Sequence, residues 1–97
     1  MKILLVGDVI GRPGRQAFSR YTRQLKKEHG IDMVIVNGEN SAGGKGVSET
    51  SLGELYGGGA DVVTTGNHIW DNREVFNIID REPYLVRPAN YPEGAPG

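Results

Sequence analysis

Cysteine is absent from this chain of 97 residues. Without a thiol the chain forms neither a disulfide framework nor a thiolate zinc site, so small secreted scaffolds and zinc ribbons are excluded. Long apolar runs are missing as well. The first apolar run covers only residues 3–6 before Asp8 interrupts it, whereas a membrane span needs about 20 apolar residues and a signal peptide about 7 to 15. We therefore expect a cytoplasmic protein with no membrane partner.

Neither sign of charge dominates the chain. Eleven Lys and Arg residues stand against 12 Asp and Glu residues, and the sequence pI is about 6.1. This balance creates no chain-wide field that would attract nucleic acid or an anionic membrane, so we expect no nucleic-acid partner. Any phosphate chemistry must then depend on a local group of residues.

Short apolar runs alternate with glycine-rich turns and amphipathic stretches, a pattern typical of βαβ units in an α/β fold with a parallel sheet. Strands are expected over residues 2–7, 32–37, 61–65 and 84–86. The second run is continuously apolar over residues 33–36, which favours a strand covered on both faces. The sequence therefore predicts three or four parallel strands.

Helices are expected between these strands. The first should begin near Pro13 and end at Gly30, with apolar residues at helical spacing at Ala17, Phe18, Tyr21 and Leu25. Ser48 should cap a short second helix that runs to about Tyr56. A third helix is expected over residues 75–79, with Asp71 and Glu74 as its capping box. After residue 87 comes a loop with no further element, which indicates a chain that stops in mid-domain.

Polar residues follow each of the first three strands. Because the carboxyl ends of parallel strands share one edge of a sheet, five polar side chains should converge there: Asp8, Glu39, Asn40, Asn67 and His68. Carboxylate, amide and imidazole donors without sulfur suit Mn, Fe, Mg or Zn. Each residue also has a simpler interpretation, as a turn residue or a loop histidine. Their coincidence at three successive strand ends favours a metal or phosphate site.

The other histidine, His29, has a different setting. It lies beside Lys26 and Lys27 in the last turn of the first predicted helix, where a cation interacts favourably with the helix dipole. We expect a structural role for His29.

Four motifs carry a family resemblance. They are GDVIGRPGR from Gly7, NGENSAGGKG from Asn37, GNHIWD from Gly66 and RPANYP from Arg87. In this order and spacing they resemble the YmdB-type branch of the calcineurin-like metallophosphoesterases. The resemblance implies a dinuclear metal centre on a four-layer α/β/β/α sandwich that hydrolyses phosphodiesters such as 2′,3′-cyclic nucleotides. Residues 1–97 would be the N-terminal part of that single domain, a parallel βαβαβα half whose strand ends form the site.

The resemblance also implies roles for individual residues. Asp8, Glu39 and Asn40 resemble ligands of one metal, with Glu39 bridging to a second metal that Asn67 also binds. His68 resembles the catalytic histidine beside the leaving group. The implied mechanism is two-metal hydrolysis, in which ions about 3.5 to 4 Å apart clamp the phosphate.

The chain departs from the wider superfamily in three respects. The first strand ends without the usual Asp-x-His, the second motif has Glu39-Asn40 in place of a Gly-Asp pattern, and no histidine follows His68. The first two departures are typical of the YmdB-type branch, whereas the third leaves the second metal short of imidazole ligands. No substrate-binding residue is implied. Lys45 and Arg12 are candidates for contacting phosphate, against the commoner case of a solvated lysine in a glycine loop.

Two alternatives remain open. Gly7, Gly11 and Gly14 suggest a non-catalytic nucleotide or phosphate-binding module. However, if Gly11 and Gly14 are the last two glycines of the Gly-x-Gly-x-x-Gly dinucleotide fingerprint, its first glycine should be at position 9, where the chain has Val9. The chain is also compatible with an inactive fragment of phosphodiesterase lineage. The expected partner in the enzymatic interpretation is a small phosphodiester, and the sequence allows a homo-oligomer.

Overall fold

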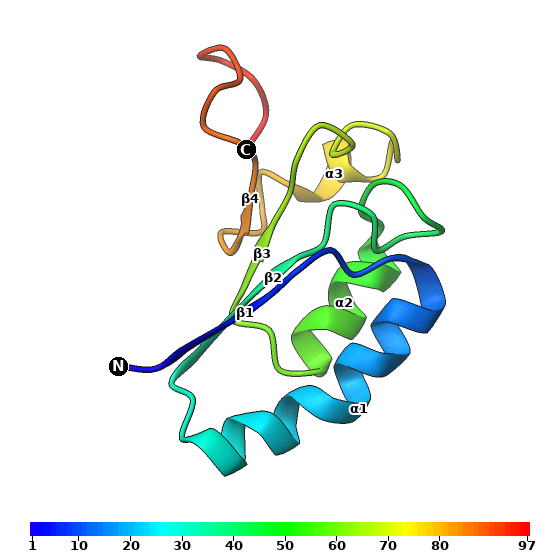
Figure 1. The fold of residues 1–97 in the computed structure, drawn as a ribbon. Helices are drawn as coiled ribbons and strands as arrows, with labels where there is room; N and C mark the ends of the chain where they lie inside the picture. Colours follow the sequence, from blue (N-terminus) through cyan, green and yellow to red (C-terminus); the bar gives the residue numbers. More distant parts are fainter.

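The computed structural model describes residues 1–97 as a four-stranded sheet with helices on one face (Figure 1). The strands lie in chain order and every neighbouring pair is parallel. The elements are β1 (Ile3–Val6), α1 (Gly11–His29), β2 (Met33–Asn37), α2 (Glu49–Gly57), β3 (Val62–Thr64), α3 (Val75–Ile78) and β4 (Leu85–Val86). The predicted parallel α/β fold is confirmed, and each predicted element is present with bounds that differ by at most two residues. Pro13 lies in the first turn of α1, at its third position.

Local signals determine where the helices end. Gly30 ends α1 in the left-handed conformation, with φ 62°, and its N–H donates to the carbonyl of Lys26. At the start of α2, Ser48 Oγ accepts from the Ser51 N–H while Ser51 Oγ accepts from the Ser48 N–H. The predicted cap at Ser48 is therefore confirmed, and Ser51 completes a capping box. No helix combines the length and apolar character that crossing a membrane requires.

The capping box predicted for α3 is wrong. Asn72 Oδ1, not Asp71, accepts a hydrogen bond from the Glu74 N–H, at 3.0 Å. The Glu74 side chain turns instead toward α2, where its Oε2 accepts from the Glu49 N–H at 3.0 Å. Because that carboxylate is engaged with another helix, it is not available to cap its own.

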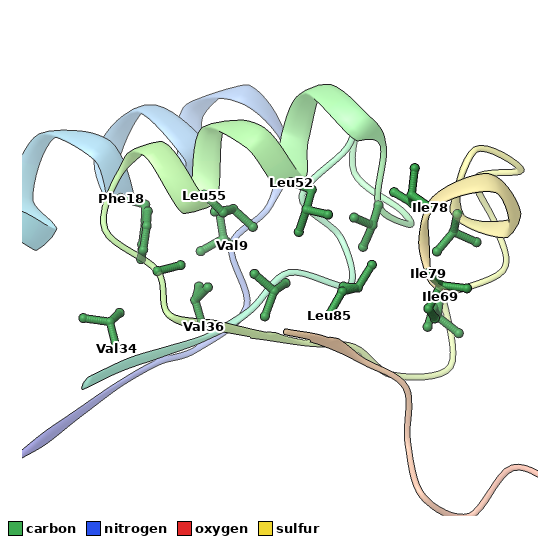
Figure 2. Close-up of a cluster of buried hydrophobic side chains, with 14 residues drawn as sticks. Val9, Phe18, Val34, Val36, Leu52, Leu55, Ile69, Ile78, Ile79 and Leu85 are labelled. Carbon is green, nitrogen blue, oxygen red and sulfur yellow. The ribbon is translucent and has the colours of Figure 1, made fainter. Parts of the chain in front are cut away.

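The core lies between the helices and one face of the sheet. In Figure 2, Phe18 of α1 and Leu55 of α2 point toward Val34 and Val36 of β2. Phe18 and Thr22 are the buried side chains of α1, whereas Tyr21 is 51% exposed. The buried face of α1 therefore contains Phe18 and Thr22 but not Tyr21, which differs from the predicted apolar face. Phe18 and Thr22 are buried because they face α2. A Cβ on Gly58 would lie 3.0 Å from the Phe18 ring, so glycine permits this close contact.

The second face of the sheet carries no helix (Figure 1). Along β1, Ile3 and Leu5 are exposed, Leu5 by 72%. In β2, Val34 and Val36 are fully buried while Met33 and Ile35 are only partly covered. The prediction that β2 is covered on both faces is thus not met within residues 1–97, and an apolar sheet face meets solvent.

Candidate active site

The loops that follow the strands lie against one another at the carboxyl edge of the sheet. The Val9 N–H donates to the carbonyl of Asn37 at 3.1 Å, and the Gly11 N–H donates to the carbonyl of Asn40 at 3.0 Å. The Gly38 N–H donates to the carbonyl of Thr64 at 2.9 Å, which joins the end of β2 to β3. These backbone bonds bring the three polar clusters of the sequence to one place.

Asn40 joins residues from two other loops. Its Nδ2 donates to both carboxylate oxygens of Asp8, at 3.0 and 2.9 Å, and its Oδ1 lies 2.8 Å from Nδ1 of His68. A carboxylate only accepts hydrogen bonds, so the amide nitrogen must face Asp8 and the amide oxygen must face His68. Since an amide oxygen also only accepts, Nδ1 of His68 carries a hydrogen, and Nε2 takes no part in this contact.

Glu39 also lies near Nδ1 of His68, the ring nitrogen that contacts Asn40. Its Oε2 is 3.7 Å from Nδ1 of His68 and accepts a long hydrogen bond, 3.4 Å, from the His68 N–H. Asn37 fixes the carboxylate by accepting from the Glu39 N–H at 3.0 Å and donating to Oε1 at 3.3 Å. The Asn37-Gly38 turn expected from the sequence therefore also positions Glu39.

Gly66 makes room for this arrangement. A Cβ at position 66 would overlap the Glu39 carboxylate, since it would lie 2.6 Å from the carboxyl carbon. Any side chain at this position would displace Glu39. The sequence indicates Gly66 only as part of the GNHIWD motif, because no local signal shows which side chain approaches a glycine.

Asn67 differs from the other four candidates. It is exposed and its side chain makes no hydrogen bond within the chain, although it directly precedes His68. The structure thus links Asp8, Asn40, His68 and Glu39 by side-chain contacts and leaves Asn67 at the same edge without such a contact.

Arg15 holds the loop that carries Glu39 and Asn40, a role that the sequence did not predict. Its Nη1 donates to the carbonyl of Ser41 at 2.6 Å and its Nε pairs with Glu54 at 2.5 Å. Ser41 in turn donates through Oγ to the carbonyl of Gly38 at 2.7 Å. Several arginines occur in α1, and nothing in the sequence shows that Arg15 is the one that binds the Ser41 carbonyl.

The donors at this edge suit a divalent cation in their chemistry. Two carboxylates, an amide oxygen and an imidazole are hard to borderline ligands for Mg, Mn, Fe or Zn. However, no group of three or more His, Asp or Glu side chains is arranged to hold a metal ion. A cation held here would need amide oxygens and additional ligands, such as water, to complete its coordination.

Two curated relatives align with nearly the whole chain. The 2′,3′-cyclic-nucleotide 2′-phosphodiesterase of Bacillus subtilis (strain 168) is 50% identical over 97 residues, which are 100% of this chain and 37% of that protein. A putative phosphatase/phosphodiesterase of Mycoplasma pneumoniae is 37% identical over 90 residues, 93% of this chain and 32% of that protein. The chain therefore spans about a third of the length of these relatives.

Solved structures share the fold. A crystal structure of a hypothetical protein from Thermus thermophilus superposes with a TM-score of 0.92 at 41% identity, covering 100% of this chain and 37% of that one. A crystal structure of a novel phosphatase from Mycoplasma pneumoniae gives a TM-score of 0.86 at 36% identity, covering 91% of this chain and 31% of that one. A family model described as YmdB-like protein matches residues 4–97. By this match over nearly its full length, the chain belongs to the YmdB-like family.

Proposed function

We propose that this chain supplies part of the active site of a metal-dependent phosphodiesterase that hydrolyses small phosphodiesters, 2′,3′-cyclic nucleotides among them. The observation that carries the proposal is the chain of contacts from Asp8 through Asn40 to His68, with Glu39 beside the ring. The activity named for the Bacillus subtilis relative supports the substrate class.

The same proposal assigns residues 1–97 to the N-terminal part of one metallophosphoesterase domain of the four-layer α/β/β/α type. The exposed second face of the sheet and the 37% coverage of the Bacillus subtilis relative support this assignment. We place the activity in the cytoplasm, with which a chain free of cysteine is compatible.

Asp8, Glu39, Asn40 and Asn67 are the proposed metal ligands, with Glu39 shared between two ions of Fe, Mn, Mg or Zn. When bound, such ions would polarise a phosphoryl oxygen and lower the pKa of a coordinated water to about 7. Because Asp8 holds the amide nitrogen of Asn40, its amide oxygen contacts His68 and would be the atom that Asn40 offers to a metal.

His68 is the proposed catalytic acid. Because Asn40 holds Nδ1–H, the ring is oriented with Nε2 free to deliver a proton to the departing oxygen, a role worth about 10² to 10⁴ in rate. The carboxylate of Glu39, 3.7 Å from Nδ1, pairs with the ring while it carries the positive charge. After proton transfer His68 is left as the neutral Nδ1–H tautomer, which Asn40 still holds.

Two substitutions in the full-length protein that contains this chain separate these roles. Glu39→Gln should abolish turnover of 2′,3′-cyclic AMP and lower metal content, because an amide has one good acceptor oxygen and no charge. His68→Ala should retain the metals and lose about 10²-fold or more in kcat.

Matched controls are available within the chain. Glu93 and His29 are exposed and their side chains make no hydrogen bond, so Glu93→Gln and His29→Ala should leave metal content and turnover unchanged. Equal loss of metal in the Glu39 and His68 variants would contradict this division of roles. Metal binding with no turnover of any phosphodiester by the unmodified protein would favour the non-catalytic module.

A further inference from the structure

A polar cleft of about 640 Å³ lies next to the candidate site. Two loops line it, the one after β2 through Gly43, Gly44 and Lys45 and the one after β3 through Asp71, Asn72 and Arg73. None of these residues is hydrophobic. The role proposed above for Asp8, Glu39, Asn40 and His68 does not use this cleft.

The cleft lies near the site, because the loops after β2 and β3 contribute residues to both. Gly43 comes three positions after Asn40 and Asp71 three positions after His68, a reach of at most about 11 Å for extended chain. The second separation is shortened further by a turn, in which the Asp71 N–H donates to the His68 carbonyl at 3.0 Å. Both loops lie at the same end of the sheet (Figure 1).

The two loops also touch each other directly. A Cβ on Gly46, which has φ 76°, would lie 2.7 Å from the backbone nitrogen of Asn72. Glycine at this position therefore lets the second loop close against the first. The two loops that line the cleft are therefore in contact at Gly46 and Asn72.

The cleft carries free hydrogen-bond donors and a net positive charge. Lys45 and Arg73 are exposed and belong to none of the four ion pairs of the chain. Asp71 is the single acidic residue of the lining. In addition, the backbone N–H groups of Gly43, Gly44 and Lys45 donate no hydrogen bond within the chain. Two unpaired cations, in a lining whose residues also include three with free backbone N–H groups, suit an anion with several acceptor oxygens.

We propose that this cleft binds a second phosphate of the substrate. The preferred substrates are then phosphodiesters that carry another phosphate within one nucleotide of the one hydrolysed, supplied either by a 5′-phosphate or by the next linkage of an oligonucleotide. This inference rests on the proposed function, because the phosphate to be hydrolysed is placed at Asp8, Asn40 and His68. The overall charge balance of the chain is no obstacle, since the attraction is local.

Three substrates test the proposal in the full-length protein: 2′,3′-cyclic AMP, its 5′-phosphorylated form, and a diadenosine dinucleotide ending in a 2′,3′-cyclic phosphate. We expect kcat/KM to be roughly tenfold higher for a substrate with a second phosphate, the effect of one charge-assisted hydrogen bond. The advantage should lie in KM and should fall as salt rises. A gain for the 5′-phosphorylated form alone identifies a terminal phosphate, and a gain for the dinucleotide identifies an oligonucleotide end.

Substitution of Lys45 and Arg73 tests whether these two cations bind the second phosphate. In the Lys45→Ala/Arg73→Ala double variant the ratio of kcat/KM between substrates with and without the second phosphate should fall to about one. Lys27→Ala removes an exposed cation from the far end of α1 and should leave the ratio as in the unmodified protein. Equal kcat/KM for all three substrates in the unmodified protein, or a ratio that survives the double substitution, would overturn the proposal.

A binding measurement separates failure of the cleft from failure of the catalytic proposal. Calorimetry should show adenosine 3′,5′-bisphosphate binding roughly tenfold more tightly than adenosine 3′-phosphate, with the difference lost in the double variant. If turnover is absent and this difference persists, the cleft stands and the catalytic proposal fails. If both ligands bind alike, the cleft proposal is overturned whatever the turnover.

Discussion

Oδ1 of Asn40 lies 2.8 Å from Nδ1 of His68, although the two residues come from loops that follow different strands. The same amide holds the Asp8 carboxylate through its nitrogen. One asparagine side chain thereby sets both the tautomer of the histidine and the position of an acidic residue. Asn40 is 8% exposed, so water competes little for these contacts.

Asn40→Asp should lower the stability of the chain at neutral pH. The substitution replaces a donor with a second carboxylate facing Asp8, and two like charges at about 4 Å repel by about 1 kcal/mol or more. Addition of MnCl₂ should recover part of the loss, because a cation between the carboxylates offsets their repulsion. Thermal unfolding with and without MnCl₂ measures both effects. Asn90→Asp, at an exposed loop position, is the matched control, and an equal loss there would contradict the account.

Gly66→Ala should displace the Glu39 carboxylate and lower metal content and turnover in the full-length protein, with little effect on folding, because the crowded atoms are the end of a flexible side chain. The new Cβ would occupy the place of the Glu39 carboxylate. Metal analysis and turnover of 2′,3′-cyclic AMP measure the displacement, and denaturant unfolding checks that stability changes little. Gly7→Ala is a suitable control, because a Cβ at that strand end would meet nothing within 4 Å. A Gly66→Ala protein that keeps the metal content and turnover of the Gly7→Ala protein would show that Glu39 does not lie where the structure places it.

Local signals made most of the fold predictable. Apolar runs located the strands, and Gly30 and Ser48 marked a helix end and a helix start. The buried face of α1 was not predictable, because Tyr21 satisfies helical spacing as well as Phe18 does. The face that is buried depends on the glycines after α2, which let Phe18 and Thr22 approach closely. That is a contact between elements far apart in the sequence, and spacing along one helix does not encode it.

The site was predictable to the extent that sheet topology determines it. The strand-end rule brought together Asp8, Glu39, Asn40 and His68, which the structure links by contacts. The rule could not show that Asn67 differs from the other four residues, because it predicts where the backbone of a strand end lies and not where its side chains point. The side chain of Asn67 is exposed and makes no hydrogen bond within the chain. The rule also could not identify Arg15, whose hydrogen bond to Ser41 joins a helix to a distant loop.

The stability of the chain should decrease at alkaline pH through Tyr56. Burial, and secondarily the charge of Glu82, raises the pKa of Tyr56 above 10.0, and its hydroxyl is buried without a hydrogen-bond partner. The unfolded chain therefore loses this proton at lower pH than the folded chain, so stability is present below about pH 10 and decreases as pH rises further.

Tyr56→Phe should reduce that alkaline decrease and raise stability at pH 7 by about 1 kcal/mol, since it removes an unsatisfied buried hydroxyl. Urea unfolding at about pH 7 and about pH 10.5, on either side of the ordinary tyrosine pKa, measures both differences. Tyr84→Phe, at a residue 61% exposed, should change neither. Stability that falls equally with pH in the Tyr56→Phe and unmodified chains would contradict the assignment.

Residues 1–97 alone should associate through the uncovered face of the sheet. Leu5 is 72% exposed and lies beside exposed Ile3 on β1, and apolar patches of this kind favour association. Leu5→Lys should shift the chain toward monomer in sedimentation velocity. Ile10→Lys, at a residue 55% exposed outside the strand, should have a smaller effect. A chain that is monomeric at all concentrations would contradict the prediction.

Paramagnetic broadening by Mn²⁺ in a ¹H–¹⁵N spectrum of residues 1–97 locates bound divalent cations, which we expect at the carboxyl edge of the sheet. The chain has a second acidic group at the opposite end of the sheet, where Asp32, Asp61 and Glu82 line another cavity, so the two locations compete within one experiment. We predict broadening centred on the amides of residues 8, 39, 40, 67 and 68, and its loss in Glu39→Gln. Broadening centred on residues 32, 61 and 82, or spread evenly over the chain, would show that divalent cations do not bind preferentially at the carboxyl edge of the sheet.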